Sequence, residues 1–242
     1  MLRAKIRSLL KRIISSPIVL WGKRLMFDEV LVIGDSHANV FYSLKFMPSF
    51  PRHFFHVVIV GGATVSGLKN PNSTTRALPI FMDSLRNSKA ATTIVLLGEV
   101  DAGFVIWYRA EKYKTPVAVM LDQATENYQN LLMEISKKSR VICISTPLPT
   151  ITDENIWGDI ANARKDVKAT QRQRTDLTIQ FNKQMQEFCD RKRFIYLSFD
   201  NECIGENGLV APWILNSNPN NHHYDRQKYA DMIINRLRSI IK

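Results

Sequence analysis

Short apolar runs alternate with helical patterns along the chain after residue 27. The runs are rich in β-branched and aromatic residues and lack a strict apolar–polar alternation, which is typical of strands buried on both faces. The pattern predicts five strands, at Val30–Ile33, Phe54–Val60, Thr93–Leu97, Val141–Ser145 and Phe194–Leu197.

Apolar residues recur at helical spacing in three segments between or after these strands. The stripes run from Ala124 to Ile135, from Leu177 to Phe188 on a polar helix of about Thr170–Arg191, and from Tyr229 to Ile240. Shorter helices are expected near Asn39–Lys45 and Thr74–Leu85.

Strand–helix alternation with five strands predicts an α/β protein whose parallel sheet is covered on both faces. Right-handed crossovers make it a three-layer α/β/α sandwich of the doubly wound, flavodoxin-like kind. We expect this domain to span residues 28–242, a length that buries a full core without disulfides or metals. Ligands of such folds bind at the carboxyl ends of the strands, so the residues after each apolar run are the site candidates.

The first predicted strand is followed directly by Gly34-Asp35-Ser36-His37. A small residue permits a tight turn, and Ser36 would then begin a helix whose dipole favours negative charge. Asp35 or Ser36 could equally serve only as the helix cap.

This turn resembles the first block of the SGNH/GDSL family of serine hydrolases, which carries the nucleophilic serine. The resemblance extends over residues 28–241 and implies that Ser36 is the nucleophile. The family's second block is a glycine after the second strand, whose N–H helps to bind an oxyanion. Gly62 and Gly67 are both candidates for that glycine, and turn formation is the alternative use of each.

The third block of the family, Gly-x-Asn-Asp, corresponds to Gly98-Glu99-Val100-Asp101. The glycine and the aspartate match, but Val100 replaces the asparagine that normally donates a hydrogen bond to the oxyanion. Loss of one such donor costs about 10²–10³ in rate in a protease. Arg109 could fill the gap, and Glu99 could orient a histidine or pair with an arginine.

The last block, Asp-x-x-His, corresponds to a segment shortly before the final helix. His223 has the family spacing and is expected to be the base that activates Ser36, with His222 as the second candidate. Asn220 stands where the family has aspartate, so Asp225 or Glu99 would have to supply a carboxylate. A solvated loop is the alternative explanation of the two histidines.

The net charge of +11 belongs mostly to the first 24 residues, which hold seven basic residues and no acidic one. Apolar residues there recur at helical spacing, which predicts a basic amphipathic helix within residues 1–27. It could lie on an anionic membrane surface, pack on the domain, or act as a transit-like leader. Its apolar part is too short to span a bilayer, and it lacks the features of a secretory signal. The rest of the chain has no basic stripe interleaved with aromatics, so no nucleic-acid partner is expected.

Three cysteines without a pairing pattern, Cys143, Cys189 and Cys203, require no oxidising compartment. We expect a cytoplasmic protein, with peripheral contact to the inner membrane face through residues 1–24.

Two segments beyond the blocks could line the site. Trp107, Tyr108 and Tyr113 could stack on a sugar or cover an acyl chain, or only cover the core. The irregular stretch from Thr146 to about Lys168 has the length of a site-lining loop, and Arg164, Arg172 and Arg174 could meet an anionic group there.

The resemblance implies a serine esterase or deacylase that cleaves an acyl or O-acetyl ester of a lipid or carbohydrate, with no metal or other cofactor. One alternative is an SGNH fold retained to bind a glycan or a partner protein. The other starts from Asp35-x-His37-x-Asn39, which also resembles the opening motif of binuclear metallophosphoesterases.

Overall fold

The computed structural model describes residues 17–153 and 167–242. Its centre is a five-stranded sheet in the order β2-β1-β3-β4-β5, and every neighbouring pair of strands is parallel. The strands are β1 (Asp28–Gly34), β2 (His53–Ile59), β3 (Thr92–Leu96), β4 (Arg140–Ile144) and β5 (Ile195–Leu197). The predicted fold class and all five predicted strands are confirmed.

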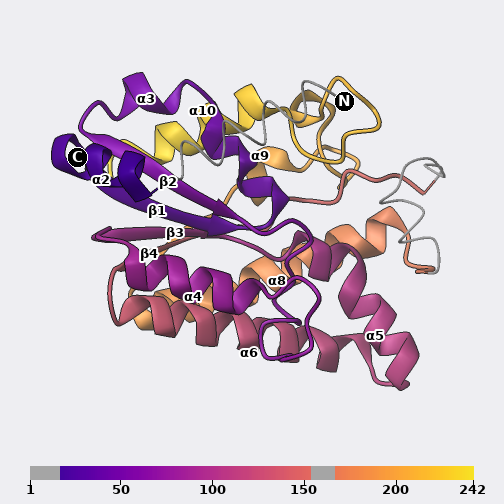
Figure 1. Ribbon diagram of the computed structural model, residues 1–242. Coiled ribbons are helices and arrows are strands. Elements are labelled where there is room, and N and C mark those ends of the chain that lie inside the picture. The colour runs from indigo at the N-terminus through magenta and orange to yellow at the C-terminus, as the bar shows by residue number, and fades with distance from the viewer. Residues whose placement is uncertain (1–16, 154–166) are drawn as a thin grey trace, which may run out of the picture.

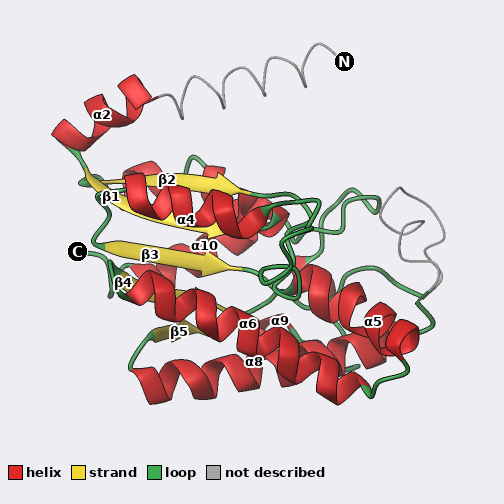
Figure 2. Cartoon of the chain, turned by 60° about the horizontal axis from the view of Figure 1, so that its bottom comes forward, coloured by secondary structure: helices red, strands yellow, loops and turns green. Residues whose placement is uncertain are grey.

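Helices cover both faces of the sheet (Figures 1 and 2). One face carries the longer helices, α4 (Ala77–Asn87), α5 (Ile106–Tyr113), α6 (Val117–Ser136) and α8 (Gln171–Lys192). The other face carries α3 (Phe46–Ser49), α9 (Asp200–Cys203) and α10 (Arg226–Leu237). Within residues 17–153 and 167–242, three short helical turns lie in the connections: the 3₁₀ helices Ser36–Tyr42 and Pro212–Ile214, and a π-helical turn at Asp101–Val105.

Strand β1 divides the apolar core into two clusters. Leu31 and Ile33 pack with residues of α4, α6 and α8, whereas Val30 and Val32 pack with residues of α10. Successive side chains of a strand point to opposite faces, so a continuous apolar run feeds both layers. This burial on both faces explains why the strands show no polar alternation.

Side-chain caps fix where the last two long helices begin. The hydroxyl of Thr170 accepts a hydrogen bond from Gln173 N–H at 3.2 Å, and the Gln173 amide oxygen accepts from Thr170 N–H at 2.8 Å, which forms a capping box for α8. The Asp225 carboxylate caps α10 by accepting from Gln227 and Lys228 N–H, each at 3.0 Å. Asp225 is thus engaged by the helix start.

Two predicted helices differ from the structure in their bounds. The helix expected near Asn39–Lys45 is a 3₁₀ helix that already begins at Ser36, and the helix expected near Thr74–Leu85 is α4, which begins at Ala77. The 3₁₀ helix begins at Ser36 because the Asp35 side chain caps it by accepting from His37 N–H at 2.8 Å.

Helix α2 (Pro17–Met26) precedes the sheet, and Figure 2 shows it projecting beyond the end of β1. Trp21, Leu25 and Met26 on it are exposed. The rest of the predicted basic helix, residues 1–16, lies outside the described residues. Among the helices that the structure describes, none is long and apolar enough to cross a membrane.

Candidate active site

Ser36 lies just beyond the carboxyl end of β1, between the carboxyl ends of β2 and β3 in the sheet. The turn is tight because Gly34 lies against Leu96 of β3 and against Ala38, whose Cβ would be 2.8 Å from a side-chain Cβ on residue 34. The buried Asp35 carboxylate accepts from His37 N–H at 2.8 Å, which caps the 3₁₀ helix and leaves Ser36 as its half-buried first residue.

A second segment, from the loop before α10, meets Ser36 at this point. His223 Nε2 lies 2.8 Å from Ser36 Oγ, and His223 Nδ1 lies 2.8 Å from Asn221 Oδ1. The same Asn221 oxygen accepts from the backbone N–H of His223 at 3.1 Å. Because this oxygen is an acceptor, Nδ1 carries the ring proton and Nε2 is free to accept the proton of the Ser36 hydroxyl.

The residue behind His223 is therefore Asn221, and the expectation that Asn220 has this position is wrong. Asn220 is exposed, and its N–H donates to Asn218 Oδ1 at 3.0 Å. The loop folds into successive turns in which asparagine side chains bond the backbone two residues on, which turns Asn221 back onto His223. The Asp-x-x-His spacing alone could not reveal this shift by one residue.

Burial, together with the electrostatic effect of the neighbouring His37 and His222 rings, lowers the pKa of His223 to about 3, against the opposing effect of Glu99. The imidazole is consequently neutral at neutral pH, which is the form that can accept a proton.

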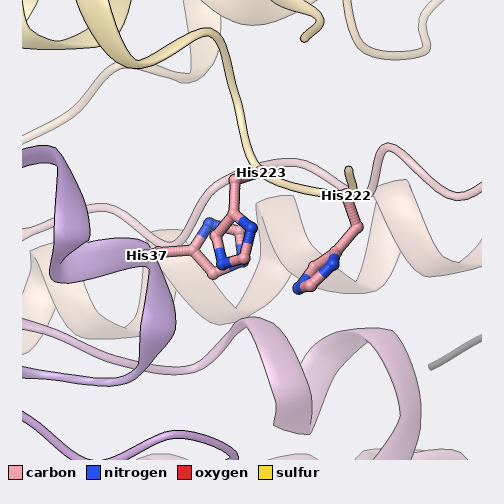
Figure 3. Close-up of side chains that lie close together, drawn as sticks. All are labelled: His37, His222 and His223. Carbon is pink, nitrogen blue, oxygen red and sulfur yellow. The ribbon is translucent and has the colours of Figure 1, made fainter. Parts of the chain in front are cut away.

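His37 and His222 surround His223 (Figure 3). The ring centres of His37 and His223 are 4.6 Å apart, and those of His222 and His223 are 4.1 Å apart. His37 is buried, and its Nε2 lies 3.6 Å from an oxygen of the buried Glu99. Glu99 thus faces a histidine, as one of the two expectations had it, but the histidine is His37.

The loop after β2 contains both candidate glycines, and their surroundings differ. The N–H of Gly67 donates to Thr64 Oγ1 at 3.0 Å, so it is engaged within the loop. Gly62 has a φ of +69°, a conformation that glycine adopts without strain. Of the two glycines, Gly67 is the less suitable backbone donor, because its N–H already has a partner in the loop.

Asp101 holds this same loop from the other side. Its carboxylate oxygens accept from Val65 N–H at 2.7 Å and from Ser66 N–H at 2.9 Å. Burial raises the pKa of Asp101 to about 6, against the opposing effect of these bonds and of the Arg109 charge. Asp101 was predicted among the binding residues, and its contacts are with the loop that carries Gly62.

Gly98 is required by close packing at the end of β3. Its φ is +116°, and a side-chain Cβ there would lie 2.8 Å from the ring of Phe181. Val100 follows in a helical turn and brings no hydrogen-bonding group to the site. Arg109 lies in α5 with its guanidinium 5.8 Å from the ring centre of Tyr113, on the helix that leads away from this turn.

The remaining candidates are placed as follows. Trp107 donates to the Ala102 carbonyl at 2.9 Å and is partly buried against the core, whereas Tyr108 and Tyr113 are exposed. Arg172 bonds the carbonyls of Asn207 and Gly208, and Arg174 bonds that of Ile151. Arg164 and most of the predicted site loop lie outside the described residues.

An open cavity of about 690 Å³ lies beside His37 and His223, lined also by Asn39, Asn216, Asn221 and Arg226 among others. Of the metallophosphoesterase-like motif, Asp35 caps the 3₁₀ helix and Asn39 bonds the Ser36 carbonyl. The two side chains thus already have partners within the turn.

No protein-family model matches the sequence, and no curated protein matches it. Solved structures do resemble it. A GDSL-like lipase from Bacteroides thetaiotaomicron has a TM-score of 0.56 at 14% identity, with 88% of this chain and 87% of that chain covered. A carbohydrate acetylesterase from Sinorhizobium meliloti has a TM-score of 0.53 at 10% identity, covering 88% and 99%. An acetyl-xylooligosaccharide esterase variant from Geobacillus has a TM-score of 0.55 at 14% identity, covering 86% and 93%. At such identities the likeness is one of fold.

Proposed function

We propose, since the chain has the fold of the SGNH hydrolases, that it is a serine esterase that cleaves acyl esters through an acyl-enzyme on Ser36. The observation that carries the proposal is the 2.8 Å contact between Ser36 Oγ and His223 Nε2. Serine is a weak nucleophile until a neighbouring base takes its proton, and this distance is within the reach that such a transfer needs.

The reaction would take place in two halves. In the first, Ser36 Oγ attacks the ester carbonyl while its proton passes to His223 Nε2, and His223 then protonates the departing alcohol oxygen. In the second, His223 takes a proton from water, the resulting nucleophile attacks the acyl-enzyme, and the acid leaves as Ser36 Oγ regains its proton. Asn221 holds the imidazole by its Nδ1–H throughout.

The oxyanion of each tetrahedral intermediate would be bound by the backbone N–H groups of Ser36 and Gly62. Ser36 begins a helical turn, and Gly62 lies in the loop that Asp101 holds by two hydrogen bonds. Val100 provides no side-chain donor, and Asn221 is a neutral group behind the histidine. Both features reduce the rate, so we expect a slow esterase compared with one that has the full set of polar groups.

We propose an O-acylated carbohydrate or lipid as the substrate class. Two of the similar structures are named carbohydrate esterases and one is named a lipase. The exposed rings of Tyr108 and Tyr113 offer faces for a sugar or an acyl chain. The basic residues at 1–24 and the exposed Trp21, Leu25 and Met26 support peripheral contact with an anionic inner membrane surface in the cytoplasm.

Fluorophosphonate labelling of the full chain tests the nucleophile directly. We expect mass spectrometry to find the label on Ser36 in the wild type and in the control S84A, whose serine lies in α4 and bonds the Ile80 carbonyl. We expect no label in S36A. The same three proteins are then assayed with p-nitrophenyl acetate and with acetylated xylo-oligosaccharides.

A folded wild-type protein that takes up no label and hydrolyses neither ester would overturn the proposal. If acetylated oligosaccharide then bound equally well to the wild type and to S36A, the fold would be serving as a binding module.

A further inference from the structure

Three histidines from two distant segments of the chain meet beside the proposed nucleophile. His37 belongs to the 3₁₀ helix after β1, and His222 and His223 belong to the loop before α10 (Figure 3). Each offers one ring nitrogen to a group whose ligand atoms all lie within 4.8 Å of one another. The esterase reaction proposed above uses His223 alone, so the other two imidazoles call for a separate explanation.

Imidazole nitrogens at this spacing are close to the geometry of a transition-metal site. Zinc binds histidine at about 2.0–2.1 Å in a tetrahedral arrangement, which separates the ligand nitrogens by about 3.4 Å. His37 is buried in a short helix and is the fixed member of the group. His222 and His223 are only half-buried and lie on a loop, so rotation of their side chains can supply the remaining closure.

The surroundings also have the features of such a site. Glu99 Oε2 lies 3.6 Å from His37 Nε2, and the Glu99 side chain is 5% exposed. An outer carboxylate of this kind orients a ligand histidine and raises its basicity. Glu99 and the buried Asp35 also bring negative charge toward the position of a cation. The open cavity lined by His37, Asn221 and His223 leaves room for a water or an anion as fourth ligand.

We propose that His37, His222 and His223 bind one divalent transition-metal ion, with Zn²⁺ as the probe, and that the ion competes with Ser36 for His223. In the structure both ring nitrogens of His223 have partners, Ser36 Oγ and Asn221 Oδ1. Coordination takes one of these nitrogens, so it breaks either the contact with the nucleophile or the contact that holds the ring. The metal is accordingly an inhibitor of the esterase. Only this consequence rests on the proposed function, because metal binding itself does not.

Metal binding is measured on the untagged, metal-stripped full chain. Isothermal titration with Zn²⁺ should give one equivalent bound, and Co²⁺ should give the visible absorption of a tetrahedral complex. H222Q should weaken binding about tenfold or more, as should the outer-carboxylate variant E99Q. H53Q removes a histidine from the opposite end of β2 and should bind as the wild type does. The three cysteines are buried and should not compete.

S36A provides a further test, because it removes the proposed competitor for His223. It should bind Zn²⁺ at least as tightly as the wild type. Circular dichroism of each variant checks that it is folded, and H222Q is the decisive one because its side chain is half-buried.

The absence of saturable Zn²⁺ binding by the wild type, or equal binding by H222Q, would overturn the metal site. Zn²⁺ that binds with the expected ligand dependence but leaves ester hydrolysis unchanged would overturn the competition with Ser36. Zinc binding by a protein that takes up no fluorophosphonate would support the site and count against the esterase.

Discussion

The two ends of β1 each carry a buried carboxyl group, Glu29 at the amino end and Asp35 just beyond the carboxyl end. The pKa values of the two groups are shifted in opposite directions. Glu29 accepts hydrogen bonds from Arg24 Nε at 2.8 Å, from the Lys89 N–H at 2.8 Å, and contacts His56 Nδ1 at 2.8 Å. Burial alone would raise its pKa, but these partners lower the pKa to about 2. Burial raises the pKa of Asp35 to about 6.

The buried carboxyl group at the amino end of the sheet stabilises the fold, whereas those at the carboxyl end surround the proposed active site. At the amino end, Glu29 pairs with the positive charge of Arg24. At the carboxyl end, Asp35, Glu99 and Asp101 are buried together, and the charges of Glu99 and Asp101 raise the pKa of Asp35 further. Such an arrangement opposes folding and persists because the surrounding core supplies stability. The four predictions below test this contrast, from the largest expected effect to the smallest.

Removing the proposed base should abolish activity and leave stability nearly intact. We expect H223Q to lower kcat/KM for an ester by about 10⁴ or more, since members of a nucleophile–base pair act as a unit. The free energy of unfolding in urea should change by no more than about 1 kcal/mol, because the half-buried ring bonds only side chains of the site. Full activity in H223Q would contradict the role of His223 as the base at the carboxyl end of β1.

Removing the charge at the amino end should have the reverse effect. The folded-state pKa of Glu29 lies below its ordinary value of 4.5, so its contribution to stability is present above pH 4.5 and is lost as the pH falls toward 2. A shift of this size corresponds to about 3 kcal/mol. We expect E29Q to lose about that much in urea unfolding at pH 7 and to converge on the wild type near pH 2.

The matched control for this variant is D83N, since Asp83 pairs with Arg86 on the exposed surface of α4. Exposed pairs contribute little, so D83N should change the unfolding free energy by less than about 0.5 kcal/mol. Equal losses of unfolding free energy in E29Q and D83N would contradict a larger contribution from the buried Glu29 than from an exposed ion pair.

Asp101 should give a pH dependence of the opposite sign to that of Glu29. Its folded-state pKa of about 6 lies above the ordinary value of 3.8, so its contribution to stability is present below pH 3.8 and is lost as the pH rises through 6. Stability of the wild type should therefore rise by about 1 kcal/mol from pH 7 to pH 5 through this group. The charge of Arg109 lowers the pKa of Asp101, and the charges of Asp101 and Asp35 repel each other.

D101N removes the titrating group, and its stability should change less between pH 7 and pH 5 than that of the wild type. Urea unfolding at the two pH values measures the difference. A wild-type curve that falls over this range, with D101N falling in parallel, would refute the assignment.

A carboxylate behind His223 should give the carboxyl end a histidine–carboxylate pair, like the pair of His56 and Glu29 at the amino end. N221D would replace the neutral acceptor of His223 Nδ1 by a carboxylate, which stabilises the imidazolium formed in the reaction. We expect kcat for an ester to rise about threefold, a small part of the factor that the reverse change costs in a serine protease. N220D is the matched control and should leave kcat unchanged, since Asn220 is exposed and bonds only within its turn. A rise of kcat in N220D with none in N221D would show that Asn220, as the family spacing predicts, is the residue behind His223.

The sequence was sufficient for the architecture because each strand is a continuous apolar run and each long helix has a regular stripe. It also led to Ser36 and His223, because both belong to motifs that can be matched in order. It could not distinguish Asn220 from Asn221, since a chain of side-chain turns at Asn216, Asn218 and Asn221 sets which amide faces the ring.

Contacts between segments far apart in the chain were also beyond the sequence. The bonds from Val65 and Ser66 to Asp101, and the approach of His37 to His223, depend on how loops from neighbouring strands meet. Residue type and spacing give no distance between such loops. The match of Gly98-Glu99-Val100-Asp101 to the third family block is the signal that pointed to Asp101, and it did not reveal which backbone groups the carboxylate holds.

The 187 residues that separate Ser36 from His223 have a consequence for biosynthesis. A ribosome completes β1 and its serine before it synthesises the imidazole, which lies 187 residues further along the chain. Because the hydroxyl has no base until then, a nascent or prematurely terminated chain carries an inert serine. On the proposed function, Ser36 therefore gains its base only after synthesis has reached the loop before α10.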